Sequence, residues 1–181
     1  MTESDQLAAR WKSEPMTTRL IAAVLVTDPD SGRLLILRRS RHLDFAPGEW
    51  DVPSGKGEPQ EPITATAVRE LKEETGVVAA EADLRLVHVV HGSWGAEIPG
   101  MFMAFVFHTD RWSGTPHNAE PHKHDTIAWV PPDDLPQPFT RTTLVAVKRY
   151  LDGGPILSFD GWPGPDDGQS GQLPQGCCPK S

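Results

Sequence analysis

Apolar runs of strand length alternate with polar, turn-forming segments along most of the chain. The first run, residues 20–26, is followed by the turn sequence DPDSG at residues 28–32. Arg33–Arg39 comes next and is predicted to pair with the first run as a β-hairpin. The loop at residues 40–48 then separates these two strands from the rest of the chain.

The later part of the chain repeats this pattern with weaker signals. Three strands are predicted there, at Leu84–Val90, Met101–His108 and Thr126–Val130. A glycine-containing loop at residues 91–100 is expected to join the first two. A closing helix is predicted over Thr142–Leu151, since two glycines follow it directly.

A helical period replaces the strand pattern after residue 60. One stripe of a helix, at about 100° per residue, collects Ala67, Val68, Leu71 and Thr75. Glu61-Pro62 suits the helix start, because proline is tolerated there and an acid stabilises the positive end of the helix dipole. Gly76 suits its end.

Strands on both sides of one strong helix, with a second helix near the end, predict an α/β or α+β layered domain. The 181 residues fit one domain with tails better than two domains. We expect residues 1–16 to be a flexible leader and residues 17–160 to be the folded domain. Residues 161–181, rich in glycine and proline, are predicted to be a disordered tail.

Composition and charge narrow the classes of partner. The chain carries 25 acidic and 17 basic residues, a net charge of -8, which argues against a protein that binds nucleic-acid polymers. An anionic small substrate stays compatible with this charge, because a divalent metal can reverse the local field. The apolar run at residues 20–26 is too short to span a bilayer, so no membrane association is expected.

Cysteine usage and the N-terminus predict a soluble, cytoplasmic protein. The cysteines, Cys177 and Cys178, are adjacent and near the C-terminus, where they cannot form a stabilising disulfide framework. Residues 1–18 are mostly polar and lack the apolar core of a signal peptide. The role of the two cysteines is left open.

Three acids crowd one edge of the predicted first helix. Glu70, Glu73 and Glu74 fall within an arc of roughly 100°, beside the buried stripe. Each like-charge pair costs about 0.2–0.5 kcal/mol in an isolated helix, so the cluster either binds a cation or is a solvated acidic face. The preceding loop, which contains Gly55 and Gly57, adds a carbonyl oxygen to a set of ligands that suits Mg²⁺.

The stretch GKGEPQEPITATAVRELKEETGV, residues 55–77, resembles the Nudix box, the signature of the Nudix hydrolases. Its pattern is Gly, five residues, Glu, seven residues, then Arg-Glu-aliphatic-any-Glu-Glu-any-Gly-aliphatic. All nine defined positions are filled, by Gly55, Glu61, Arg69, Glu70, Leu71, Glu73, Glu74, Gly76 and Val77. The resemblance implies the Nudix α/β/α sandwich, with a mixed sheet between helices.

The resemblance also implies roles for these residues. Members of the family hydrolyse a nucleoside diphosphate linked to another group, with Mg²⁺ as cofactor and Mn²⁺ as a substitute. Glu70, Glu73 and Glu74 would be metal ligands, with the Gly55 carbonyl as a fourth. Glu73, Glu74 and Arg69 would serve catalysis: a glutamate takes a proton from water and Arg69 orients it, but which glutamate is the base is left open. Glu61 and Gly76 would be structural.

Several branches of the family supply a further glutamate from a loop after the box. Glu120 is our candidate for this metal ligand, and an exposed loop acid is the alternative. His117, His122 and His124 lie in the same stretch and could indicate zinc. Their irregular spacing and the lack of a nearby cysteine favour a solvent-exposed loop instead.

Three residues are candidates for binding the substrate. Trp50 could stack on a base, although a core tryptophan is the alternative reading. Arg38 ends a predicted strand near the expected cleft and could bind phosphate. Lys56 lies within the box loop and is the third candidate.

The leading functional hypothesis is a MutT-like pyrophosphohydrolase, which would cleave a nucleoside triphosphate, including a damaged or modified one, to the monophosphate and pyrophosphate. ADP-ribose or a nucleotide sugar is the alternative substrate. That branch often has a proline closer to the box than Pro99, which lies 22 residues past Val77. A nucleotide-sensing module without catalysis is the non-enzymatic alternative. The exact nucleotide and a homodimer, which many members form, are left open.

Overall fold

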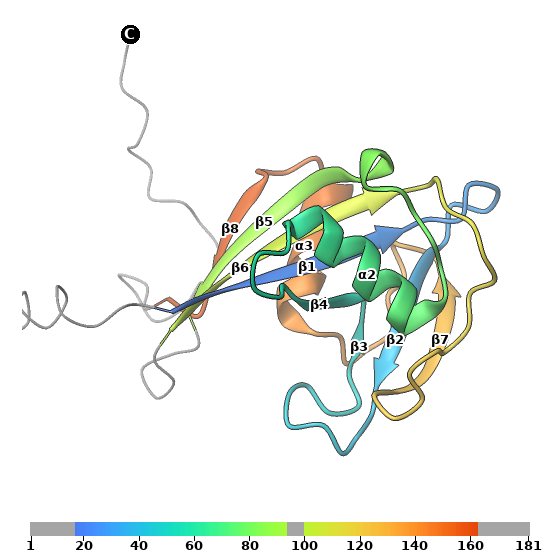
Figure 1. Ribbon diagram of the computed structural model, residues 1–181, viewed down its shortest axis with the longest axis horizontal. Coiled ribbons are helices and arrows are strands. Elements are labelled where there is room, and N and C mark those ends of the chain that lie inside the picture. Colours follow the sequence, from blue (N-terminus) through green and yellow to red (C-terminus); the bar gives the residue numbers. More distant parts are fainter. Residues whose placement is uncertain (1–16, 94–99, 163–181) are drawn as a thin grey trace, which may run out of the picture.

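The computed structural model describes residues 17–93 and 100–162 (Figure 1). The predicted leader at residues 1–16 lies outside the described residues, as does the predicted tail from residue 163 onward, with Cys177 and Cys178. Pro99 lies outside them too. The boundaries expected for the folded domain, residues 17–160, stay a prediction.

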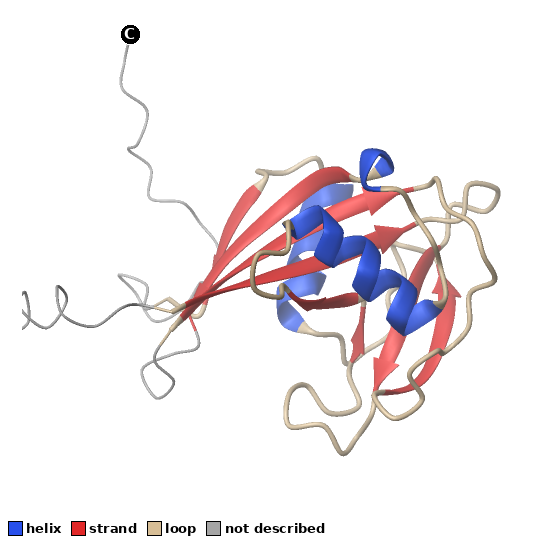
Figure 2. Ribbon diagram, in the orientation of Figure 1, coloured by secondary structure: helices blue, strands red, loops and turns tan. Residues whose placement is uncertain are grey.

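A five-stranded mixed sheet forms the centre of the molecule (Figure 2). Its strands, in spatial order, are β4 (Ser54–Lys56), β1 (Thr18–Val26), β6 (Met101–Thr109), β5 (Arg85–Ser93) and β8 (Leu157–Asp160). The pairs β1–β6 and β5–β8 are parallel, whereas β1–β4 and β5–β6 are antiparallel.

One long helix covers each face of this sheet (Figure 1). Ala22 and Val24 of β1 belong to one core cluster with residues of α2 (Ile63–Thr75). Ala23 and Leu25 belong to the other cluster, with residues of α3 (Arg141–Leu151). Because successive strand residues point to opposite faces, the buried part of β1, residues 22–26, is apolar at every position. The predicted α/β sandwich with a mixed sheet between helices is confirmed.

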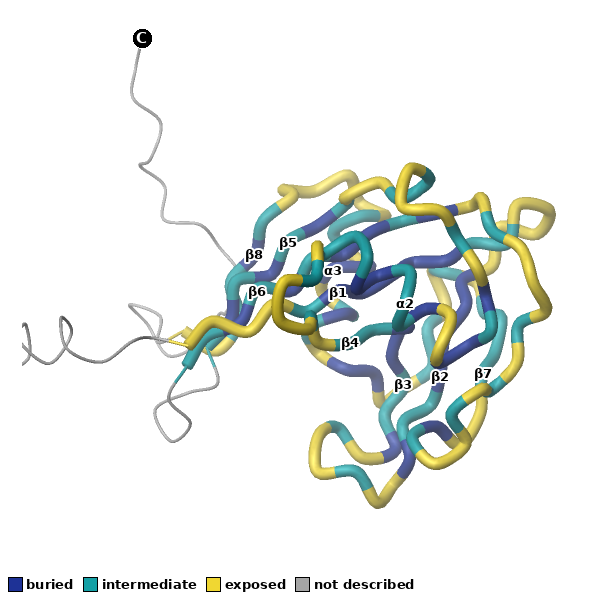
Figure 3. Tube along the Cα trace, in the orientation of Figure 1, coloured by how far each residue is buried: buried dark blue, intermediate teal, exposed yellow. Residues whose placement is uncertain are grey.

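A smaller sheet lies beside the first and consists of β3 (Trp50–Asp51), β2 (Leu34–Arg39) and β7 (His124–Val130). The predicted hairpin between residues 20–26 and 33–39 is therefore wrong. The two edges of β1 are occupied by β4 and β6, and the bridge to β2 is made by Thr27, the residue after β1, with Leu34. Figure 3 shows β2 mostly buried, β7 mostly of intermediate burial, and most of the connecting loops exposed.

Other elements differ from the predictions at their ends. β5 continues to Ser93, so the loop expected at residues 91–100 begins later, and β7 starts at His124, two residues early. β8 was not predicted, nor was the 3-10 helix η1 (Glu81–Asp83). Neither helix of the described segments is long and apolar enough to cross a membrane.

Asp51 links the smaller sheet to α3 within the protein interior. Its side chain accepts hydrogen bonds from the Thr143 hydroxyl at 2.6 Å and from the Val52 amide at 2.9 Å. The Arg39 guanidinium lies 4.0 Å from the other carboxylate oxygen. Burial raises the pKa of Asp51, and the Thr143 hydrogen bond opposes that rise. The carboxylate thus depends on a few donors that α3 and β2 supply.

Thr143→Val should lower the free energy of unfolding by about 1–3 kcal/mol, because it removes one donor from a buried carboxylate without changing side-chain shape. Thr142→Val is the matched control, since the Thr142 hydroxyl donates to the partly buried Asp160. Its effect should stay below about 1 kcal/mol. Urea unfolding measures both, and equal losses would contradict the role given to Asp51.

Candidate metal centre

The helix that carries the acidic cluster has well-defined ends. Pro62 is the residue before the first turn, and its carbonyl accepts a hydrogen bond from the Thr66 amide at 3.0 Å. Gly76 ends the helix with φ 71°, a left-handed conformation that favours glycine. A Cβ there would also lie 2.3 Å from the His117 ring. The sequence therefore sets where α2 stops, directly after Glu73, Glu74 and Thr75.

Arg69 joins one end of the acidic cluster to the loop before the helix. Its guanidinium donates to Glu61 at 2.8 Å, to Glu70 at 2.8 Å and to Glu73 at 3.0 Å. It also donates to the Lys56 carbonyl at 3.1 Å. The hydrogen bond from Arg69 is the main cause that lowers the pKa of Glu61 to about 2. Glu61 and Arg69 thereby fix the orientation of two of the three clustered acids.

Glu70 packs directly against the backbone of Gly55. A Cβ at Gly55 would lie 1.9 Å from the Glu70 carboxyl carbon, so a larger residue would displace this side chain. Burial raises the pKa of Glu70, and the contact with Arg69 opposes that rise. Glycine is required here by a close approach to the backbone and not by an unusual φ angle.

Glu74 lies deeper than the other two acids, with only 4% of its surface exposed. One carboxylate oxygen accepts a hydrogen bond from the Ser54 amide at 2.9 Å. Burial raises the pKa of Glu74 well above its usual range, and the neighbouring carboxylates of Glu70 and Asp51 add to the rise. The environment of Glu74 thus disfavours a bare negative charge.

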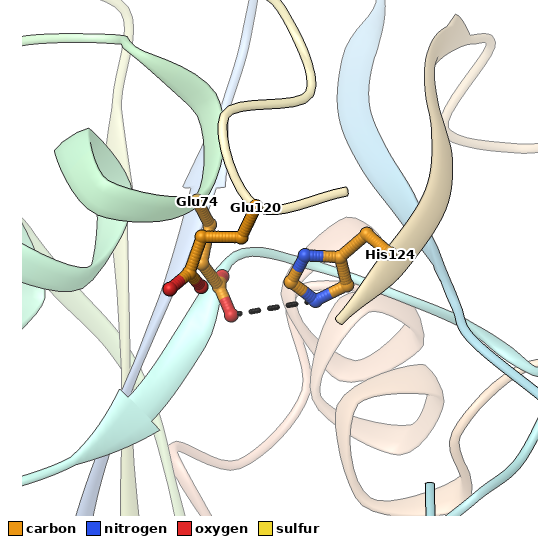
Figure 4. Close-up of side chains that lie close together, drawn as sticks. All are labelled: Glu74, Glu120 and His124. Carbon is orange, nitrogen blue, oxygen red and sulfur yellow. Dashed lines mark ion pairs between the residues drawn. The ribbon is translucent and has the colours of Figure 1, made fainter. Parts of the chain in front are cut away.

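Glu120 and His124 converge on Glu74 from outside α2 (Figure 4). One ligand atom from each of the three residues lies within 4.8 Å of the other two. His124 Nε2 lies 3.5 Å from Glu74 Oε1, and His124 Nδ1 has no hydrogen-bond partner among the described residues. Burial is the main cause that lowers the pKa of His124 to about 4, so its imidazole is neutral at pH 7.

These three side chains fit a divalent cation. Two carboxylates and a neutral imidazole are ordinary metal ligands. The Glu74 carboxylate is buried, and Nδ1 of the buried His124 lacks a hydrogen-bond partner among the described residues. Lys123 Nζ lies 2.9 Å from Glu120 and supplies a positive charge at the rim of the cluster.

The structure groups the predicted metal ligands into two sets. Glu74 and Glu120 belong to the convergent cluster, whereas Glu70 and Glu73 contact Arg69. The Gly55 backbone lies against Glu70, at the boundary between the two sets.

The expectation of a solvent-exposed histidine loop is wrong for His124, which is 1% exposed, and holds for His117 and His122, which are exposed. Sequence reasoning missed His124 because it began the strand at Thr126. In the structure His124 is the first residue of β7 and pairs with Arg39 across the sheet. Starting the predicted strand two residues earlier, at His124, would have placed this histidine in the sheet.

The predicted substrate-binding residues occupy different surroundings. Trp50 is half-buried and packs against the core cluster on the α3 side. The Arg38 guanidinium lies 6.0 Å from the centroid of the Trp50 ring, and Arg38 Nε donates to the Gly48 carbonyl at 3.2 Å. Lys56 is exposed and touches the acidic cluster through its carbonyl, which binds Arg69.

A cavity of about 290 Å³ lies between α3 and the end of β8. Its lining includes Arg141, Lys148, Ser158 and Asp160, and none of the predicted site residues. Arg141 and Asp160 form an ion pair with each other. The cavity is therefore a feature separate from the acidic cluster.

Comparisons with known proteins agree with this architecture. A family model described as the NUDIX domain matches residues 17–150. CTP pyrophosphohydrolase of Escherichia coli is 29% identical over 134 residues, which are 73% of this chain and 90% of that protein. RNA pyrophosphohydrolase of Erythrobacter litoralis is 32% identical over 119 residues, covering 56% of this chain and 73% of that one. The crystal structure of a MutT NUDIX hydrolase from Burkholderia pseudomallei has a TM-score of 0.64 and 30% identity, covering 73% and 97% of the two chains.

Arg69→Met should lower stability at pH 7, and the loss should shrink in acid. The folded-state pKa of Glu61, about 2, lies below its usual value of 4.5. The stabilisation from this carboxylate is therefore present above pH 4.5 and is lost as pH falls toward 2. Thermal unfolding between pH 7 and pH 3 measures the difference between variant and parent.

Lys72→Met is the matched control, because Lys72 is exposed on the same helix. It should change the melting temperature little at either pH. An Arg69→Met variant that behaves like this control would contradict the bridging role of Arg69.

Proposed function

Because this chain belongs to the Nudix hydrolases, enzymes of phosphoric anhydride bonds whose domain model matches residues 17–150, we propose that it cleaves a nucleoside triphosphate to the monophosphate and pyrophosphate. A damaged or modified nucleotide is included among the substrates proposed. The observation that carries the proposal is the convergence of Glu74, Glu120 and His124 beside an intact Nudix box. Similarity to a protein named CTP pyrophosphohydrolase supports a triphosphate substrate.

We assign the cation to the convergent cluster, with Mg²⁺ as the expected ion and Mn²⁺ as a substitute. When bound, a divalent cation neutralises phosphate oxygens and lowers the pKa of a water that it holds. Glu74 and Glu120 would hold the ion, with His124 beside them. Glu70 and the Gly55 carbonyl would complete the oxygen set toward the substrate.

The residues around Arg69 then act on the attacking water. The Glu73 side chain is 49% exposed, so it can exchange a proton with solvent, while Arg69 holds its carboxylate in orientation. Glu70 shares the same guanidinium from a more buried position. Glu70 and Glu73 contact the same guanidinium nitrogen, so the proton acceptor is assigned to the pair and not to one residue.

The candidate substrate-binding residues are given roles according to which of their side-chain atoms are exposed to solvent. Lys56 is exposed at the end of β4, beside Gly55, where its ammonium can bind a phosphate oxygen. Arg38 and Trp50 lie together at the end of β2 and β3, and the accessible part of Trp50 would contact the base or sugar. Lys123, which pairs with Glu120, would exchange that partner for a phosphate once a cation binds.

The proposed setting is the reducing cytoplasm, with a small nucleotide as the partner and no nucleic-acid polymer. A homodimer, common in the family, is a further expectation that sedimentation of the full chain would test. ADP-ribose and nucleotide sugars are the competing substrates.

A substrate panel with product identification tests the function. Nucleoside triphosphates, oxidised triphosphates, nucleotide sugars and dinucleoside polyphosphates are incubated with the full-length protein and Mg²⁺. We expect a monophosphate and pyrophosphate from one or more triphosphates. Turnover of ADP-ribose alone, or release of orthophosphate from triphosphates, would overturn the proposed reaction.

Glu73→Gln should lower turnover by roughly 10²–10⁴-fold, because it removes a candidate proton acceptor, and Glu74→Gln should also lower it by orders of magnitude, because it removes a candidate metal ligand. The melting temperature of metal-free Glu74→Gln should not fall, because a buried amide costs less than a buried carboxylate. Glu58→Gln, an exposed acid in the same loop region, is the control and should keep full activity. Full Mg²⁺-dependent turnover by either Glu73→Gln or Glu74→Gln would refute these roles.

Gly55→Ala should lower turnover by about 10²-fold, because a new methyl group would displace the Glu70 carboxylate by more than an ångström. The fold should persist, since the clash involves the end of a side chain. Gly57→Ala is the matched control, with its nearest neighbour, Thr66 Oγ1, at 3.4 Å from the added Cβ. Equal activities of the two variants would contradict the packing argument.

A further inference from the structure

We infer that the cluster of Glu74, Glu120 and His124 is a mixed nitrogen–oxygen metal site, in which an imidazole nitrogen of His124 binds the ion and favours Mn²⁺ over Mg²⁺. This inference rests on the proposed function, because it takes the same cluster as the place of the cation. It goes further by adding a ligand that lies outside the Nudix box and by changing the ion that the site prefers.

The distance between Glu74 and His124 suits two ligands of one ion better than a hydrogen bond. His124 Nε2 and Glu74 Oε1 are 3.5 Å apart, longer than the usual N–H···O distance of about 2.9 Å. Metal–ligand bonds of about 2.0–2.2 Å place adjacent ligand atoms on one ion about 3.0–3.5 Å apart. An ion could therefore bind between these two atoms with little movement of either side chain.

The surroundings of His124 leave its ring without a complete set of partners. The side chain is 1% exposed, so water does not satisfy it from bulk solvent. Nδ1 has no hydrogen-bond partner within the described part of the chain. Buried polar atoms are nearly always paired, so a buried imidazole whose Nδ1 is unpaired, and whose Nε2 lies 3.5 Å from the Glu74 carboxylate, indicates a bound group. Figure 4 shows the ring directed at Glu74 and Glu120.

The three candidate ligands are held in place by separate elements of the fold. Glu74 lies in the last turn of α2, and His124 begins β7 in register with Arg39. Glu120 lies between them in the chain, and its carbonyl accepts a hydrogen bond from the His124 amide at 3.0 Å. The arrangement is preorganised for an ion, because backbone contacts hold Glu120 and His124 relative to each other.

A nitrogen ligand alters which ion the site selects. Mg²⁺ is bound mostly by oxygen atoms and keeps several waters. Imidazole suits the first-row transition ions, whose affinity for such sites rises from Mn²⁺ toward Cu²⁺. Replacing one oxygen ligand by His124 therefore raises the affinity for Mn²⁺ relative to Mg²⁺.

The decisive experiment detects the nitrogen directly. Full-length protein, with no nucleotide present, is loaded with Mn²⁺ and studied by electron spin-echo envelope modulation. We expect coupling from a directly bound nitrogen, and we expect the pattern to change when the histidines are labelled with ¹⁵N. Competition titrations give the Mn²⁺ and Mg²⁺ affinities of the same samples.

His124→Gln should remove the nitrogen coupling and reduce the ratio of Mn²⁺ to Mg²⁺ affinity roughly tenfold or more. His122→Gln is the matched control, an exposed histidine two residues away, and should retain both. Circular dichroism checks that each variant is folded.

Bound Mn²⁺ without histidine coupling in the parent protein would overturn the inference, whether or not His124→Gln folds. An unchanged affinity ratio in folded His124→Gln would overturn it as well. Triphosphate hydrolysis without nitrogen coupling would refute this inference and leave the proposed function standing. Nitrogen coupling without hydrolysis of any nucleotide would support this inference and refute the proposed function.

Discussion

The burial of the Glu74 carboxylate is the constraint on which the arrangement of the surrounding residues depends. A charge removed from water needs compensation from donors, a proton or a cation. The Ser54 amide gives one donor, and His124, being neutral, supplies no charge. Asp51, buried nearby, adds a second carboxylate to the same region. The fold thus concentrates negative charge in a place where a divalent ion is the natural counterpart.

Arg69 compensates the negative charge of three other acids in and before α2, which we call the outer acids. Its guanidinium contacts Glu61, Glu70 and Glu73, so those carboxylates carry a built-in counter-charge. The inner and outer acids of one helix therefore differ in what compensates them. In the proposed site, this difference gives neighbouring glutamates separate roles, with Glu74 at the cation and Glu73 facing solvent.

The site was predictable where it depends on local sequence. The acids of α2, the Gly76 end and the Gly55 loop all lie within 23 residues, and helical spacing alone brings the acids to one edge. His124 was missed because its burial depends on pairing with Arg39, which is 85 residues earlier in the chain.

The elements of the fold were likewise predictable where they depend on local sequence. Helix positions and most strand positions were predictable from periodicity. The predicted pairing of β1 with β2 was wrong, because β1 pairs with β4 and β6 instead. β8 is four residues long and pairs with β5 across a long separation, which leaves little local signal.

The placement of Glu120 on an irregular connection between β6 and β7 has an evolutionary consequence. Insertions or deletions in that connection would reposition one residue of the proposed metal site, while helix and strand keep the other two in place. Divergence among descendants of this enzyme could then retune ion choice by changing loop length alone, at small risk to folding.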